Sequence, residues 1–429
     1  MFLIVTKVSF WVLHVVVHVI YIDIPRLQRA LKLMTEERRL EETKEKIDFL
    51  STRTNTRCFF SFESFSDLHY TSPPYNGHIS TLLCAFRPPK PIRYTRQVVD
   101  GVDGNPICLD WFLAEEKNVP ANGIMIIFPG LASWSQTNYV QHYVWHAHDR
   151  GFHCCVFNAR GMGDTPLTRP RLMSASWTGD LRWVTRTELS RRALSLRFGT
   201  TAQNVWGVGF SLGGVVLAKY LHEEGQNMTH ELPFDAALII NSPLDTLAVS
   251  ANMMQPENAL YQKNLFAGLI RYAIRHKDML KQLPGINDDG IRKDPLRFLK
   301  RLKTINEFDA HITAPHNGFS NPEEYYAAVN TLTSLRHCTI PTLCVIARDD
   351  PVTGEPPRKE MRELVNANSL VAFIELPYGG HLGYIGSPVE EWRGDPSFME
   401  LLTCNICQAS QGKGLSGDAG SRKEKLFIK

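Results

Sequence analysis

Short apolar runs recur along the chain from about residue 101, and each is followed by a longer amphipathic stretch. Continuous apolar runs suit strands that are buried on both faces, and strands that alternate with helices favour a parallel sheet. We expect six such strands, at residues 124–128, 154–157, 205–208, 237–240, 342–346 and 372–376. The pattern therefore predicts an α/β fold with a mostly parallel, doubly wound sheet.

The interval between the fourth and fifth expected strands contains no strand-like run. We expect residues 243–335 to form a helical lid inserted into a catalytic domain at 101–400. The residues before this domain, 25–100, read as a charged amphipathic helix followed by an irregular, proline-rich lead-in. Residues 401–429 are expected to be a flexible tail, because their end is rich in Gly, Ser and Lys.

The first residues of the chain form a separate apolar segment. Residues 2–22 are mostly apolar, with Lys7, His14 and His18 as interruptions, and a membrane-spanning helix needs about 20 such residues. No small-residue cleavage site follows. We therefore predict an uncleaved single-pass anchor at residues 1–24, in the endoplasmic reticulum or another endomembrane. A buried or interfacial helix is the alternative. The basic residues after the segment favour a cytosolic catalytic domain.

Composition and charge exclude several classes of protein. The 429 residues carry a formal net charge of only +3, and we find no Lys/Arg run dense enough to follow a nucleic-acid backbone. The nine cysteines are scattered rather than arranged as a secreted disulfide pattern. Cys404 and Cys407 have CxxC spacing, but no second ligand pair is near, so we expect no metal site and no cofactor.

A five-residue GxSxG pattern, Gly209 to Gly213, follows the expected strand at 205–208 and precedes a helix-like stretch at 214–221. This strand–turn–helix context is what a nucleophile elbow requires, because the sharp turn exposes the serine hydroxyl. We therefore predict Ser211 as a catalytic nucleophile. A structural glycine turn is the alternative.

A serine hydroxyl needs a base, and the base needs a carboxylate to hold it. His381 lies between glycines just after the last expected strand, where a loop histidine can reach the site. Asp349 and Asp350 both follow the strand at 342–346. We favour Asp350 as the acid because it precedes Pro351 and Val352, the position where the triad acid usually lies in a fold with this elbow. We expect Asp349 to orient the loop. The opposite assignment remains open.

The same chemistry needs two oriented N–H donors for the tetrahedral oxyanion. One is expected from the backbone of Leu212, the residue after the nucleophile. The other is expected from the backbone of Leu131, in the loop after the strand at 124–128. Neither role depends on the leucine side chain.

Residues 75–400 resemble a branch of the α/β-hydrolase superfamily, the AB hydrolase 4 family. Its members include animal α/β-hydrolase-domain proteins 1, 2 and 3, yeast medium-chain ethyl-ester synthase/esterases and bacterial YheT. The resemblance implies an α/β-hydrolase fold, a triad of Ser211, Asp350 and His381, and an N-terminal anchor. It rests on motifs at 103–111, 158–163, 170–182, 209–214, 309–326, 341–351 and 380–383.

Together these features predict a membrane-associated serine hydrolase that cleaves lipid esters through an acyl-enzyme. The expected partners are a membrane and a lipid ester: an acylglycerol, a phospholipid or a medium-chain acyl ester. Three alternatives stay open at this point. They are an acyltransferase or ester synthase that uses the same triad, a soluble hydrolase of small esters, and a non-catalytic scaffold.

Overall fold

A computed structural model describes residues 48–50, 76–114, 121–199, 204–227 and 231–409 of the chain. The expected anchor at 1–24 lies outside these residues, as does nearly all of the expected amphipathic helix at 25–50. Within the described ranges, no helix combines the length and the apolar character needed to cross a membrane.

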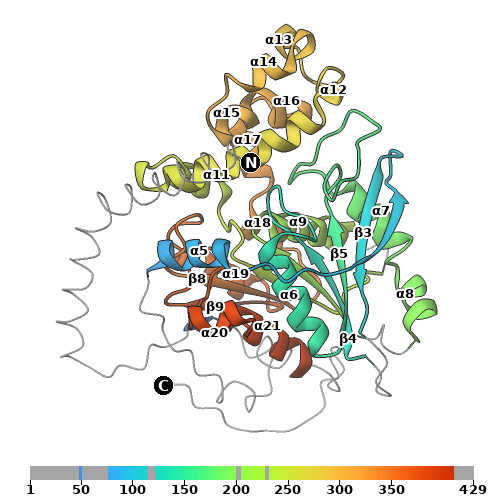
Figure 1. Ribbon diagram of the computed structural model, residues 1–429, viewed down its shortest axis with the longest axis vertical. Coiled ribbons are helices and arrows are strands. Elements are labelled where there is room, and N and C mark those ends of the chain that lie inside the picture. Colours follow the sequence, from blue (N-terminus) through green and yellow to red (C-terminus); the bar gives the residue numbers. More distant parts are fainter. Residues whose placement is uncertain (1–47, 51–75, 115–120, 200–203, 228–230, 410–429) are drawn as a thin grey trace, which may run out of the picture. The chain divides into compact units, whose positions relative to one another are not determined.

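The core of the protein is a nine-stranded sheet with the order β1-β9-β8-β7-β6-β4-β5-β3-β2 (Figure 1). All six expected strands are present and lie parallel to one another. The α/β fold is therefore confirmed. These strands are β4 (Gly123–Phe128), β5 (Phe152–Asn158), β6 (Val205–Phe210), β7 (Ala236–Ile240), β8 (Thr342–Ala347) and β9 (Val371–Leu376).

Three antiparallel strands complete the sheet, and the hydrophobic pattern did not reveal them. β2 (Thr95–Asp100) and β3 (Pro106–Phe112) form a hairpin at one edge, and β1 (Asp48–Leu50) pairs with β9 at the other. β2 is an edge strand of mostly polar, exposed residues, so it lacks the apolar run by which the other strands were found. The lead-in was thus wrongly expected to be irregular up to residue 100.

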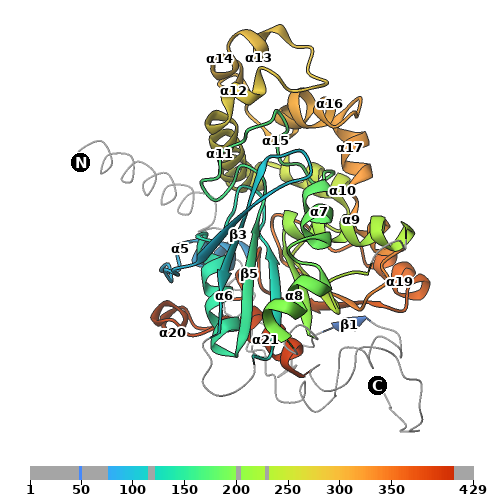
Figure 2. The same ribbon diagram turned by 90° about the vertical axis from the view of Figure 1, so that its right-hand side faces the viewer.

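Helices cover both faces of the sheet (Figure 2). One hydrophobic cluster joins the sheet to α7, α8, α9 and α19, and a second joins the opposite face to α6 and α21. These helices are α6 (Asn138–Asp149), α7 (Gly179–Arg186), α8 (Arg191–Phe198), α9 (Leu212–Asn227), α19 (Arg358–Ala367) and α21 (Phe398–Ala409), with α20 (Pro388–Arg393) before the last.

The region expected to be a lid is helical, and α11 to α17 gather at one end of the molecule in both views (Figures 1 and 2), whereas α18 packs against α9 and α19. Its longest helix, α11, packs against α14 and α15 around a separate hydrophobic cluster. Its elements are α10 (Thr246–Met253), η3 (Pro256–Asn258), α11 (Ala259–Arg275), α12 (Lys277–Leu280), α13 (Asp289–Lys293), α14 (Pro295–Leu299), α15 (Ile305–Phe308), η4 (Asp309–Thr313), α16 (Ala314–His316), α17 (Pro322–Ala328) and α18 (Thr331–Leu335).

Residues 401–409 were expected to belong to the flexible tail, but they form part of α21; residues 410–429 lie outside the described ranges. Leu402, Cys404, Ile406 and Cys407 are buried against the sheet and α6. Burial raises the pKa of the Cys404 thiol to about 12, so this thiol stays protonated at neutral pH and packs as a small apolar group.

Helix α5 (Gly77–Phe86) also lies in the lead-in. Arg87 directly follows this helix, and its guanidinium is 2.7 Å from the Glu400 carboxylate of α21. The two side chains are only 3% and 2% exposed. Arg87 also donates to the carbonyls of Glu391 and Asp395. This buried ion pair therefore connects the lead-in to the C-terminal helix.

Replacing Arg87 by methionine is expected to lower the free energy of unfolding by about 3–5 kcal/mol, because Glu400 would remain buried without its cation. Urea denaturation measures the loss. The double variant Arg87→Met/Glu400→Leu removes both charges and should recover much of it. An equal loss in the single and double variants would show that the unpaired carboxylate is not its cause.

Candidate active site

Ser211 lies at the turn between β6 and α9, with a backbone φ of +50°. Non-glycine residues rarely adopt this left-handed conformation, and it is the strain expected of a nucleophile elbow. The Ser211 N–H donates to the Ile240 carbonyl at 2.9 Å. A Cβ atom at Gly213 would overlap the Phe128 carbonyl, so the glycine allows α9 to approach β4.

The three expected triad residues come together in the structure. His381 Nε2 lies 3.1 Å from Ser211 Oγ, and His381 Nδ1 lies 2.8 Å from Asp350 Oδ2. Each residue follows the carboxyl end of a parallel strand: Ser211 follows β6, Asp350 follows β8 and His381 follows β9. Because these ends share one edge of the sheet, the topology brings together residues that are up to 170 positions apart.

The surroundings of Asp350 keep its carboxyl group ionised. Burial raises its pKa, but the charge of His381 and hydrogen bonds from His381 and Asn241 outweigh burial and hold the pKa below its usual range. The backbone N–H groups of Val352 and Thr353 donate to its other oxygen at 2.8 and 3.1 Å. The carboxylate is therefore fixed in orientation and available to an imidazolium.

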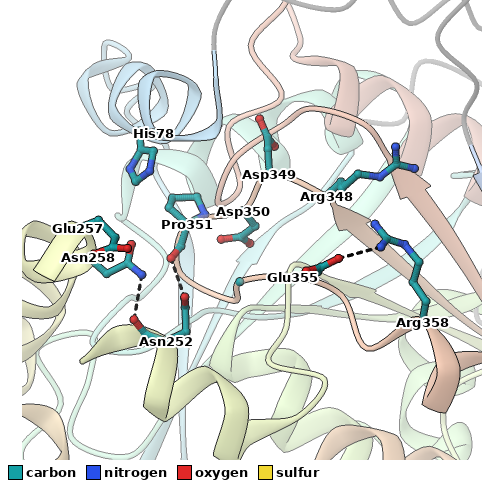
Figure 3. A pocket seen from close by; sticks show the side chains of 11 residues that line it. His78, Asn252, Glu257, Asn258, Arg348, Asp349, Asp350, Pro351, Glu355 and Arg358 are labelled. Atoms are coloured by element: carbon teal, nitrogen blue, oxygen red, sulfur yellow. Dashed lines mark hydrogen bonds and ion pairs between the residues drawn. The ribbon is translucent and has the colours of Figure 1, made fainter. Parts of the chain in front are cut away.

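Asp349 has a different environment. Its Oδ1 accepts a hydrogen bond from the Gly380 N–H at 2.9 Å, and burial raises its pKa to about 6. Figure 3 shows the two neighbouring carboxylates pointing in different directions at the edge of an open polar groove of about 600 Å³. The geometry brings Asp350, and not Asp349, to the His381 ring.

Asn241 is a further member of this cluster, and the sequence analysis did not identify it. It follows β7 with a φ of +46°. Its amide donates to Asp350 Oδ2 at 2.7 Å and to the Gly380 carbonyl at 3.1 Å, and the Tyr384 hydroxyl donates to its side-chain oxygen. An asparagine directly after a buried strand, where left-handed backbone is tolerated, was the one available signal.

The two expected oxyanion donors lie beside the nucleophile. Leu212 is the first residue of α9, and Leu131 lies in the loop after β4. Both line the same cavity as Ser211. Among the described residues, neither backbone N–H has a hydrogen-bond partner. A Cβ atom at Gly130 would lie 3.2 Å from the Ser211 Cβ, so this loop passes close to the elbow.

A largely apolar cavity of about 200 Å³ opens beside Ser211. Its walls come from the elbow, the Leu131 loop and the lid helices α10, α11 and α15. Polar side chains are also present in the lining. Among them, the Tyr326 hydroxyl donates to Asp309 at 2.8 Å, and burial raises the Asp309 pKa to about 6. The apolar lining residues include Met173, Val216, Val249, Met253, Met254, Leu265, Leu269, Ile305, Val329 and Val352.

The chain is similar in sequence to several known proteins. A family model described as the alpha/beta hydrolase family matches residues 125–393. An abhydrolase domain-containing protein of Dictyostelium discoideum is 31% identical over 342 residues, which are 77% of this chain and 80% of that protein. Phospholipase ABHD3 of Mus musculus is 28% identical over 335 residues, 77% of this chain and 75% of that protein. A monoacylglycerol lipase of Saccharomyces cerevisiae is 29% identical over 307 residues, 70% of this chain and 62% of that protein.

Proposed function

This chain belongs to the alpha/beta hydrolase family and is a carboxylic-ester hydrolase, and from that premise we propose that it cleaves lipid esters through an acyl-enzyme on Ser211. The observation that carries the proposal is the continuous series of contacts from Ser211 Oγ through the His381 ring to Asp350, at the wall of an apolar cavity.

The mechanism follows from these positions. His381 Nε2 accepts the Ser211 proton as Ser211 Oγ attacks the ester carbonyl carbon, and Asp350 stabilises the resulting imidazolium. The N–H groups of Leu131 and Leu212 bind the oxyanion. Collapse of the tetrahedral intermediate expels the alcohol, which takes the proton from His381. Water then repeats the sequence on the acyl-enzyme and releases the free acid.

The proposed substrate class rests on the lining of the cavity and on the relatives. Apolar side chains from the lid surround the space beside Ser211, and such a wall favours an acyl chain over a polar acid. Two of the relatives are named as a monoacylglycerol lipase and a phospholipase. We therefore propose acylglycerols, phospholipids or medium-chain acyl esters as substrates, presented at a membrane that residues 1–24 would bind.

A fluorophosphonate probe tests the nucleophile directly. We expect the intact protein to be labelled once, on the tryptic peptide that contains Ser211, and to lose the label after Ser211→Ala. Labelling should compete with turnover of a dispersed monoacylglycerol or phosphatidylcholine.

Ser242→Ala is a matched control. Ser242 is buried and follows the neighbouring strand β7, as Ser211 follows β6, so this variant should keep the label. A label on a different serine, or an unlabelled protein that still turns over esters, would contradict the assignment.

A further inference from the structure

Helix α5 lies against the loop that carries His381, although the sequence places it far from the catalytic motifs. Their contact joins residues 300 positions apart in the chain. Figure 3 shows His78 of α5 at the edge of the polar groove, across from Glu257 and Asn258 of the lid. The His78 ring also stacks on the Tyr261 ring of α11. The helix thus contacts both the histidine loop and the lid.

Thr81 makes the contact nearest to the expected base. Its Oγ1 donates to the Gly77 carbonyl at 2.6 Å, one turn earlier in α5. The same oxygen accepts the backbone N–H of His381 at 2.8 Å. One hydroxyl therefore links the helix backbone to the residue whose ring must face Ser211.

Two further side chains of α5 bind the loop on either side of His381. Ser80 Oγ donates to the Gly379 carbonyl at 2.9 Å, and Cys84 Sγ donates to the Leu382 carbonyl at 3.2 Å. Together with Thr81, they contact three backbone groups within four consecutive residues. Such dense side-chain-to-backbone bonding leaves the loop little freedom to shift.

Glycines in the loop make this close approach possible. Gly380 has a φ of +58°, and a Cβ atom there would overlap the Gly77 carbonyl. A Cβ atom at Gly383 would lie 2.5 Å from Ser80 Oγ. The glycines around His381 therefore serve contact with α5 as well as the turn itself.

The opposite side of the loop is held by Asp349, which follows β8, and by Asn241, which follows β7. The Gly380 N–H donates to Asp349, and its carbonyl accepts from Asn241. With α5 on the other side, the backbone of His381 is fixed from two directions. The 3.1 Å distance between His381 Nε2 and Ser211 Oγ depends on where that backbone lies.

We propose that Thr81 is a positioning residue for His381 and that α5 completes the active site from outside the region in which the sequence places the catalytic domain. This inference rests on the proposed function, since it takes His381 to be the base. A misplacement of the order of 1 Å in a reacting group costs about a hundredfold in rate, so loss of the Thr81 contact should affect the chemical step.

The test uses Thr81→Val, which keeps the side-chain volume and removes the hydroxyl, in the full-length protein with a dispersed monoacylglycerol. We expect kcat to fall by roughly 10- to 100-fold and KM to stay within about two-fold, because the acyl cavity is unchanged. The rate of fluorophosphonate labelling should fall in parallel. Thr81→Ser restores the hydroxyl and should restore kcat.

Thr185→Val is a matched control. Thr185 is a helical threonine whose hydroxyl donates to the Leu181 carbonyl at 2.8 Å and accepts from the Tyr220 hydroxyl at 3.0 Å. It thus repeats the two bonds of Thr81 at a place that does not contact the triad. We expect this variant to lose thermal stability and to keep its kcat.

The inference is overturned if Thr81→Val keeps the kcat of Thr185→Val, or if Thr81→Ser is as impaired as Thr81→Val. Should Thr81→Val fail to fold, Thr81→Ala replaces it, and a wild-type kcat in that variant is equally contradictory. Ser211→Ala in the same assay distinguishes a failure of the proposed function from a failure of the role of α5. If it retains turnover, the proposed function fails. If it is inactive while Thr81→Val is unaffected, only the role of α5 fails.

Discussion

Ser211→Ala is expected to lower kcat for ester hydrolysis by roughly a millionfold, the scale seen when a triad nucleophile is removed from a serine hydrolase. Without Oγ no acyl-enzyme forms, and His381 has no proton to accept. What remains is binding in the apolar cavity and the oxyanion donors, which alone leave a small residual rate. Purified protein and a chromogenic ester measure the loss.

The double variant Ser211→Ala/His381→Ala provides the sharper test. If the two residues act as one unit, removing both should cost little more than removing either, because the first change already abolishes the shared step. Thermal unfolding of each variant checks that the fold persists. Losses that multiply in the double variant would show that Ser211 and His381 act in separate steps.

The sequence predicted the parallel centre of the sheet because those six strands are buried on both faces. Most residues of these strands are apolar, as in the fully buried β6 and β8, although β5 contains His153 and β9 contains Glu375. β2 carries mostly polar residues at an edge. β1 is three residues long and forms by pairing with β9. The local hydrophobic pattern gives little indication of a strand that forms by pairing with a segment far away in the chain.

The triad residues could be predicted for a related reason. The GxSxG turn is local, and the fold fixes the chain order in which acid and base follow it. The sequence left Asp349 and Asp350 as alternatives, since both follow β8 and the folded loop sets which side chain reaches His381. Thr81 left no sequence signal, and Asn241 left only its position after a buried strand, because their roles come from contacts with His381 and Asp350 across long stretches of chain.

The sequence also does not predict which side chains of the lid line the cavity. Residues 243–335 were expected to be helical, and they are. Which of their side chains line the cavity depends on how α10, α11 and α15 fold back over Ser211. Met253 and Met254 lie next to each other in the chain, and both face this space although one is buried and the other is 53% exposed. The spacing of apolar residues along the chain does not predict that both methionines face the cavity.

Asp350→Asn is expected to lower kcat by about ten-thousandfold, the loss that follows when a triad carboxylate becomes an amide and the imidazole takes the wrong tautomer. The neighbouring change Asp349→Asn is the matched control. Asn keeps an oxygen that can accept the Gly380 N–H, so we expect kcat within a few-fold of wild type. A loss in Asp349→Asn as large as that in Asp350→Asn would reverse the assignment of the acid.

The dependence of protein stability on pH is a second test of the environment of Asp349. The Asp349 pKa is raised to about 6 by burial, against about 3.9 for an unfolded Asp, so the folded state holds this proton more tightly than the unfolded one. Its ionisation therefore costs stability progressively from about pH 4, with the full cost present above about pH 6. Asn cannot ionise, so the melting temperature of Asp349→Asn should gain on wild type between about pH 4 and pH 6 and keep that gain at higher pH. A constant difference over that range would mean that the Asp349 pKa is not raised.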